Sequence, residues 1–228
     1  MITRNRFATL ILLAHLSVVS ASAQTAQAYP VDEKKPLFVD ESIGEIYVLA
    51  DVQPKAFSGM FKMTSNYHAV VWKEGRAAGS ALIVSYIDDV AFHDALLQLG
   101  GEPGNNLEMA AWNERKNPRS DAPDQRIDGT PVEMLVWWPG LDYPLPVDSL
   151  FTDPGGRGID LRFGGNKALI PEWRSGCFVC LYSCPGSKVG NRAYTIRDYV
   201  KGTTKFEANM RLLPKKKTRA VLIFRLKE

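Results

Sequence analysis

Cysteine is absent from almost the whole chain. Only three of the 228 residues are cysteines, and all of them lie between residues 177 and 184. A small secreted domain held together by disulfides would carry many more cysteines, at spacings spread along the chain. The scarcity therefore excludes a disulfide framework and directs attention to one short segment.

The chain also lacks a large charge excess and the signatures of common catalytic centres. The formal net charge is +3, which gives no global case for binding nucleic acid. There is no Ser-His-Asp motif, no HExxH and no paired-carboxylate signature, and the glycine-rich turns at residues 155–158 and 164–166 lack phosphate-loop spacing. We therefore expect no nucleic-acid partner and no stand-alone enzyme.

Long apolar runs are missing beyond the first residues. Arg4 and Arg6 precede an apolar run and the small-residue site Ala21-Ser22-Ala23, which predicts a signal peptide over residues 1–23. The apolar run is too short and too interrupted to span a bilayer as a mature helix. We expect the mature protein to begin near Gln24 and to work in the periplasm or another extracytoplasmic compartment, with no stable membrane span.

The remaining pattern predicts a single β-rich α+β domain over residues 37–228, preceded by a polar linker at residues 24–36. The βαβ alternation of a parallel sheet is missing, so we expect an antiparallel or mixed sheet. Residues 105–130 are polar and rich in Pro, Asn and Asp, and are expected to form an exposed excursion. Apolar and β-branched runs predict strands over residues 45–52, 67–72, 132–138, 158–163 and 218–226, and a strand or helix start over residues 81–86.

One main amphipathic helix is predicted between Asp88 and Leu99. Asp88 or Asp89 is the expected N-cap, and Gly100-Gly101 the stop signal. The apolar face of this helix would be made of Val90, Phe92, Leu96, Leu97 and Leu99.

The cysteines follow the spacing C-x2-C-x3-C-P at Cys177, Cys180 and Cys184. This is the last part of the bacterial ferredoxin run C-x2-C-x2-C-x3-C-P, with its first cysteine missing. The spacing predicts that the three thiolates bind an iron–sulfur cluster or another metal. A four-iron cluster would need a non-cysteine fourth ligand, a partner chain or an open iron site, and a three-iron cluster or a tetrahedral metal site is also possible.

Two local shapes permit such a site. On a helix the three thiols would share one face without pairing as disulfides, and in a loop between Gly176 and Pro185-Gly186 backbone amides could turn toward sulfur. His68 or His93 could supply a further ligand or orient a thiolate, or each could be a packed core histidine.

Two other interpretations remain open at this stage. Outside the cytoplasm thiols tend to pair, so Cys177 and Cys180 could form a thiol–disulfide redox pair, although no thioredoxin-like βαβ context surrounds them. Alternatively the cysteines are structural and the domain is a cofactor-free binding module.

Several segments together resemble the YdjY-domain family of exported bacterial proteins. They are YHAVV at residues 67–71, FHDALLQLG at 92–100, PGNN at 103–106, LRFGGN at 161–166, GCFVCLYSCP at 176–185 and FRLK at 224–227. The resemblance implies a ferredoxin-like cysteine motif that only a subfamily carries on a common scaffold. It favours electron transfer or assembly within an extracytoplasmic redox system, with a redox partner protein.

Overall fold

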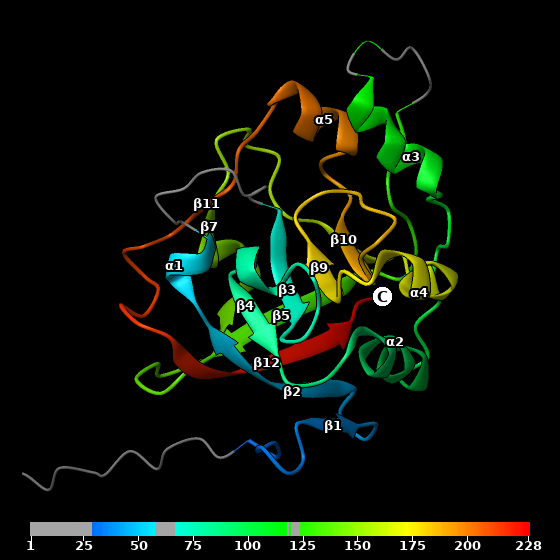
Figure 1. Ribbon diagram of the computed structural model, residues 1–228. Coiled ribbons are helices and arrows are strands. Elements are labelled where there is room, and N and C mark those ends of the chain that lie inside the picture. Colours follow the sequence, from blue (N-terminus) through cyan, green and yellow to red (C-terminus); the bar gives the residue numbers. More distant parts are fainter. Residues whose placement is uncertain (1–28, 58–66, 118, 120–123) are drawn as a thin grey trace, which may run out of the picture.

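The computed structural model describes residues 29–57, 67–117, 119 and 124–228. The predicted signal peptide and its cleavage site lie outside these residues. The described part of the chain forms a mixed sheet of ten strands with short helices around it (Figure 1). This confirms the β-rich α+β class expected from the sequence.

The large sheet has the order β6-β5-β12-β2-β4-β3-β9-β10-β8, and β1 pairs with β2 beside this path. Only the pairs β3–β4 and β9–β10 are parallel among the described strands. A separate ribbon is made of β7 (Phe151–Thr152) and β11 (Glu207–Ala208). The strands of the large sheet are β1 (Leu37–Asp40), β2 (Glu45–Val52), β3 (His68–Trp72), β4 (Ile83–Ser85), β5 (Val132–Trp137), β6 (Leu145–Pro146), β8 (Leu161–Phe163), β9 (Cys177–Cys180), β10 (Val189–Asn191) and β12 (Thr218–Leu226).

The helices are short and lie around the sheet. Figure 1 shows α3 and α5 together at the top of the molecule, with α4 and α2 at the right. The α-helices are α1 (Pro54–Phe57), α2 (Asp89–Gln98), α3 (Met109–Asn113), α4 (Ile170–Trp173) and α5 (Ile196–Lys201), and the 3-10 helices are η1 (Ala78–Ser80), η2 (Glu114–Lys116), η3 (Val147–Leu150) and η4 (Lys167–Leu169). None of the helices in the described part of the chain is long and apolar enough to cross a bilayer.

The two longest strands, β2 and β12, lie side by side within the large sheet. β2 and β12 pair antiparallel over eight residues, from Thr218 opposite Val52 to Arg225 opposite Glu45. Their bounds are those predicted from their apolar and β-branched sequences. β5 alternates buried and half-buried residues along its length, which is the pattern of a strand with one face on the core.

Helix α2 forms where the sequence predicted a helix. The Asp88 side chain accepts a hydrogen bond from the Ala91 N–H at 2.7 Å, so Asp88 is the N-cap. Phe92 stacks on Phe178 of β9 with ring centroids 4.5 Å apart, and packs on Phe224 of β12. The helix is therefore fixed against the strand that carries the cysteines.

Two predictions about exposure were wrong in detail. Val90 and Leu97 are not part of the packed face of α2, because they point outward and are 37% and 43% exposed. The region from 105 to 130 is not an exposed excursion throughout, because Leu107, Ala111 and Ile127 form a small buried cluster. These residues pack the segment onto itself, and the Ile127 N–H donates to the Ser183 hydroxyl at 3.0 Å, which ties the segment to the rest of the domain.

Candidate functional site

The three cysteines lie on strand β9 and just after it. Cys177 and Cys180 are the first and last residues of β9, and Cys184 lies in the loop leading to β10. All three are free thiols and buried, with 3%, 1% and 4% of their surfaces exposed. The segment is therefore neither a regular helix nor a loop throughout. The strand forms because β3 and β10 pair with it on either side and satisfy its backbone groups.

Irregular pairing between β3 and β9 brings the first two thiols together. Residues three apart in a regular strand face opposite sides of the sheet. Here Cys177 pairs with Val71 and Cys180 with His68, and the register shifts twice between these pairs. Such bulges re-aim side chains. His68 faces the same side as its partner Cys180, and its Nδ1 lies 3.4 Å from the Cys177 Sγ, so the three side chains meet.

The three thiols form one buried group. The side chains of Cys177 and Cys184 both interact with that of Cys180. Burial, followed by the contact with Cys177, raises the pKa of the Cys180 thiol well above its usual value. The hydrogen bond with Cys180, followed by burial, does the same for the pKa of Cys184. Solvent-exposed nucleophilic cysteines have the opposite character, with a lowered pKa and access to water.

The two candidate histidines have different surroundings. His68 lies at the cysteines, and burial lowers its pKa to about 4, so its imidazole is neutral at physiological pH. A neutral imidazole is the form that binds metals. His93 contacts the Gly165 carbonyl oxygen through Nε2 at 2.9 Å and Asp94 through Nδ1. His93 therefore fits a packed, hydrogen-bonded core residue, and His68 is the histidine of the site.

Lys188 is a site residue that the sequence analysis did not single out. It is fully buried, one residue before β10, and its backbone N–H donates to the Cys177 carbonyl oxygen at 3.3 Å. Burial lowers the pKa of its ammonium group, and Asp89, followed by Cys177 and Cys184, opposes that shift. No single-residue signal distinguishes a buried lysine from a surface one, so only the fold reveals it.

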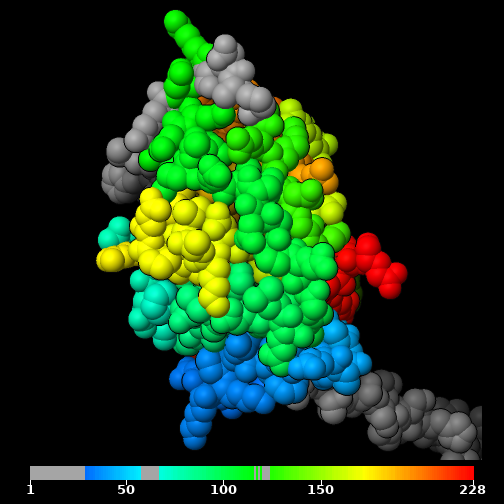
Figure 2. All heavy atoms as spheres, turned by 90° about the vertical axis from the view of Figure 1, so that its right-hand side faces the viewer, coloured from blue at the N-terminus to red at the C-terminus, as the bar shows by residue number. Residues whose placement is uncertain are grey.

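The loop that carries Cys184 packs against Trp173 of α4. The indole of Trp173 packs so closely on Gly186 that an added Cβ there would approach Trp173 Cε3 to 2.4 Å. The segment with η4 and α4 lies on the face of the molecule shown in Figure 2, coloured yellow. A narrow crevice without room for water also reaches Cys184, and it is lined by Asn106, Leu107, Ile127, Gly164, Asn166, Cys184, Pro185 and Ser187.

The extended form of β9 limits the chemistry of the first two thiols. Three residues of a regular strand span about 10 Å, somewhat less with a bulge. A disulfide needs Cα atoms within about 7 Å of each other. A crosslink between Cys177 and Cys180 would thus require β9 to depart from its extended form.

The donor set at the site consists of three sulfurs and one imidazole nitrogen. Cys3His is one of the sets that bind zinc in proteins, and thiolates also bind iron–sulfur clusters. As the side chains stand, no group of three or more His, Cys, Asp or Glu residues in the described ranges converges as a metal site. The donors fit a thiophilic metal in chemical type, and the thiols would have to lose their protons and draw together to hold one.

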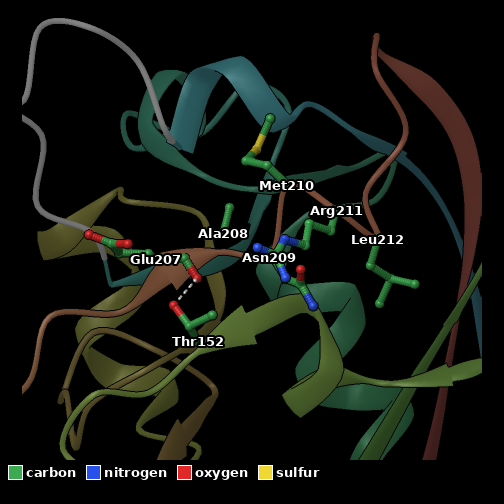
Figure 3. A pocket seen from close by; sticks show the side chains of 7 residues that line it. All are labelled: Thr152, Glu207, Ala208, Asn209, Met210, Arg211 and Leu212. Carbon is green, nitrogen blue, oxygen red and sulfur yellow. Dashed lines mark hydrogen bonds between the residues drawn. The ribbon is translucent and has the colours of Figure 1, made fainter.

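A larger hollow, of about 710 Å³, lies elsewhere, at the ribbon of β7 and β11. Figure 3 shows Thr152 and Glu207 joined across this ribbon, with Met210 and Leu212 pointing in different directions. Met210 is 52% exposed. The hollow contains none of the predicted site residues and no cysteine or histidine, so it lacks the thiolate and imidazole donors that the cysteine segment offers.

Comparisons with known proteins agree with the resemblance in the sequence. The YdjY domain model matches residues 37–225. The chain belongs to the YdjY-domain family. It is similar to the uncharacterized protein YdjY of Escherichia coli (strain K12), with 30% identity over 227 residues, covering 97% of this chain and 94% of that protein. No solved structure matches the chain.

Proposed function

We propose that this YdjY-domain protein binds a thiophilic metal, as a single ion or an iron–sulfur cluster, through Cys177, Cys180 and Cys184, with His68 as the fourth ligand. The observation that carries the proposal is the contact of 3.4 Å between His68 Nδ1 and Cys177 Sγ, beside two further buried thiols. In a tetrahedral zinc site, metal–ligand distances of about 2.3 Å for sulfur and 2.0 Å for nitrogen place these two donors about 3.5 Å apart. The contact therefore has the spacing of two ligands of one metal.

The His68 imidazole would supply the fourth ligand that the cysteine motif lacks. The ferredoxin run has four cysteines and this chain has three, so a non-cysteine ligand is required. Histidine has precedent in that role, because Rieske centres use two histidines in place of two cysteines on one iron. The spacing of His68 and Cys177 favours a shared single ion, while the sequence motif favours a cluster.

The proposed setting is an extracytoplasmic redox system, in which the protein transfers electrons or takes part in metal assembly with a partner protein. The support is the signal peptide that the sequence predicts at residues 1–23, together with three cysteines that cannot all pair with one another. N-terminal sequencing of exported material should begin near Gln24. An intact Met1 on membrane-bound protein would contradict the export proposal.

Metal analysis of single variants tests the ligand set. Cys177→Ser, Cys180→Ser and Cys184→Ser should each abolish or severely weaken metal binding in protein purified and reconstituted without oxygen. His68→Gln should lower the affinity for the metal at least about tenfold, since even outer-shell changes cost that much.

The matched control is His93→Gln, which removes a histidine that is also buried but whose ring nitrogens contact the Gly165 carbonyl oxygen and Asp94. It should keep the wild-type metal content. Equal metal content in the His68 and His93 variants would refute the role of His68, and full metal content in any cysteine variant would refute the shared site.

A further inference from the structure

The positive charge of the chain is concentrated in one segment. Residues 205–219 contain six of the 28 basic residues and one of the 25 acidic residues, which leaves 22 basic and 24 acidic residues in the rest of the chain. The segment includes β11 and continues into the start of β12. It therefore has a net charge of +5, while the remaining residues together have a net charge of −2.

Most of these cations have no acidic partner in the part of the chain that the structure describes. Lys217 and Arg219 both pair with Asp51. The side chains that form no ion pair with another described residue are those of Lys205, Arg211, Lys215 and Lys216, and all four are exposed. They are therefore available to an anionic surface outside the molecule.

Exposed apolar side chains accompany this charge. β5 pairs antiparallel with β12, and its last residue, Trp137, lies opposite Val221 near the start of β12. The loop that follows β5 and the segment that precedes β12 therefore leave the sheet at the same end, which lies at the left in Figure 1. Tyr143 of that loop is 67% exposed, and Met210 of that segment is 52% exposed.

This combination of side chains suits the surface of a lipid bilayer. Lys and Arg attract the headgroups of anionic lipids, while tyrosine and apolar side chains beside them enter the interfacial layer. A fixed anion bound in the neighbouring hollow is disfavoured, because the acidic Glu207 lines that hollow together with Arg211. Cations spread over an exposed segment match a fluid anionic surface better than a single fixed ligand.

We propose that this end of the domain docks on an anionic lipid bilayer through the side chains of Tyr143, Met210, Arg211, Lys215 and Lys216. The cations hold the headgroups, and Tyr143 and Met210 enter the interfacial layer. The contact is peripheral and reversible, and it keeps the protein on the membrane surface. It is a property separate from the proposed metal site and does not depend on it.

The test is co-sedimentation of the protein, purified from the exported fraction, with vesicles of equal parts phosphatidylglycerol and phosphatidylcholine. Binding should be strong on these vesicles, weak on phosphatidylcholine alone, and weaker at high salt. The double variant Lys215→Gln/Lys216→Gln should bind the mixed vesicles about twentyfold more weakly, because each cation near an anionic surface strengthens binding about fivefold.

The matched control for charge is Lys167→Gln/Arg174→Gln. It removes the same charge from exposed positions beside α4, at the right in Figure 1. Its affinity for the mixed vesicles should equal that of wild type, because these side chains lie away from the docked end.

A second pair of variants tests the apolar contact. Tyr143→Ser/Met210→Ser should weaken binding to the mixed vesicles at least about tenfold, since both side chains lose apolar area that enters the interfacial layer. Val90→Ser/Leu97→Ser is the matched control, because it removes exposed apolar side chains from α2. That control should bind as wild type does.

Three results would overturn the proposal. Wild-type protein that binds neither kind of vesicle, or both equally, has no preference for anionic lipid. Equal losses in the Lys215/Lys216 variant and its control would show a response to net charge alone. Unchanged binding of the Tyr143/Met210 variant would show that neither side chain enters the bilayer, and would assign the cations to a soluble acidic partner. None of these results would alter the proposed metal site.

Discussion

Replacing Leu96 by alanine tests how α2 is held on the sheet. Leu96 has no exposed surface and lies on the face of the helix that places Phe92 against Phe178 and Phe224. Truncation removes buried methyl and methylene groups and leaves a cavity that the close-packed aromatic rings can fill only in part. The Leu→Ala range of about 2–5 kcal/mol applies, and we expect about 3 kcal/mol. For a domain of this size, that lowers Tm by roughly 6–12 °C.

The assay is urea unfolding followed by tryptophan fluorescence, with Leu97→Ala as the matched control. Leu97 is the next residue on the same helix and is 43% exposed, so its truncation should change the free energy of unfolding by no more than about 0.5 kcal/mol. The reasoning is refuted if Leu96→Ala costs less than about 0.5 kcal/mol, or if the two variants are equally destabilised.

Three further outcomes follow from the structure. Burial lowers the pKa of His68 from 6.5 in the unfolded chain to about 4 in the folded protein, so between these pH values only the unfolded chain takes up this proton. The free energy of unfolding of metal-free protein should therefore drop by about 3 kcal/mol as pH falls from 6.5 to 4. In urea titrations at a series of pH values, His68→Gln should flatten this part of the curve. Asp88→Ala removes the hydrogen bond to the Ala91 N–H and should cost about 1 kcal/mol by the same assay, whereas Asp88→Ser should cost clearly less; equal losses would show that the cap does not matter. Gly186→Ala places a Cβ against the Trp173 ring and should cost about 1–3 kcal/mol, with a smaller penalty in a Trp173→Leu background; a penalty independent of Trp173 would locate the strain elsewhere.

The elements that the sequence predicted well are those with long, consistent local signals. β2 and β12 are long, rich in apolar and β-branched residues, and have the predicted bounds. α2 has a capping aspartate at one end and Gly100-Gly101 at the other. In each case local preference and tertiary packing agree.

Short elements escaped prediction because pairing across the sheet creates them. β10 is the three-residue strand Val-Gly-Asn, and a glycine and an asparagine are poor strand formers. It forms because β8 and β9 lie on either side of it. The helix α3 lies in a polar segment whose few apolar residues gave no period long enough to detect.

The candidate site was predictable in its residue types and not in its geometry. The spacing of the cysteines singled out Cys177, Cys180 and Cys184. The choice of His68 over His93 depends on which strand pairs with β9, and the meeting of Cys177 with Cys180 depends on shifts in that pairing. Lys188 had no sequence signal, because its burial comes from the surrounding fold.

The most direct test of the account is the metal, iron and sulfide content of wild-type protein purified and reconstituted without oxygen, combined with a count of its free thiols. The account predicts one bound thiophilic ion or cluster for each chain, with Cys177, Cys180 and Cys184 all recovered as free thiols once the metal is removed and the chain is unfolded. Protein that holds no metal after reconstitution, and whose cysteines are either three free thiols or one thiol with a disulfide, would contradict it.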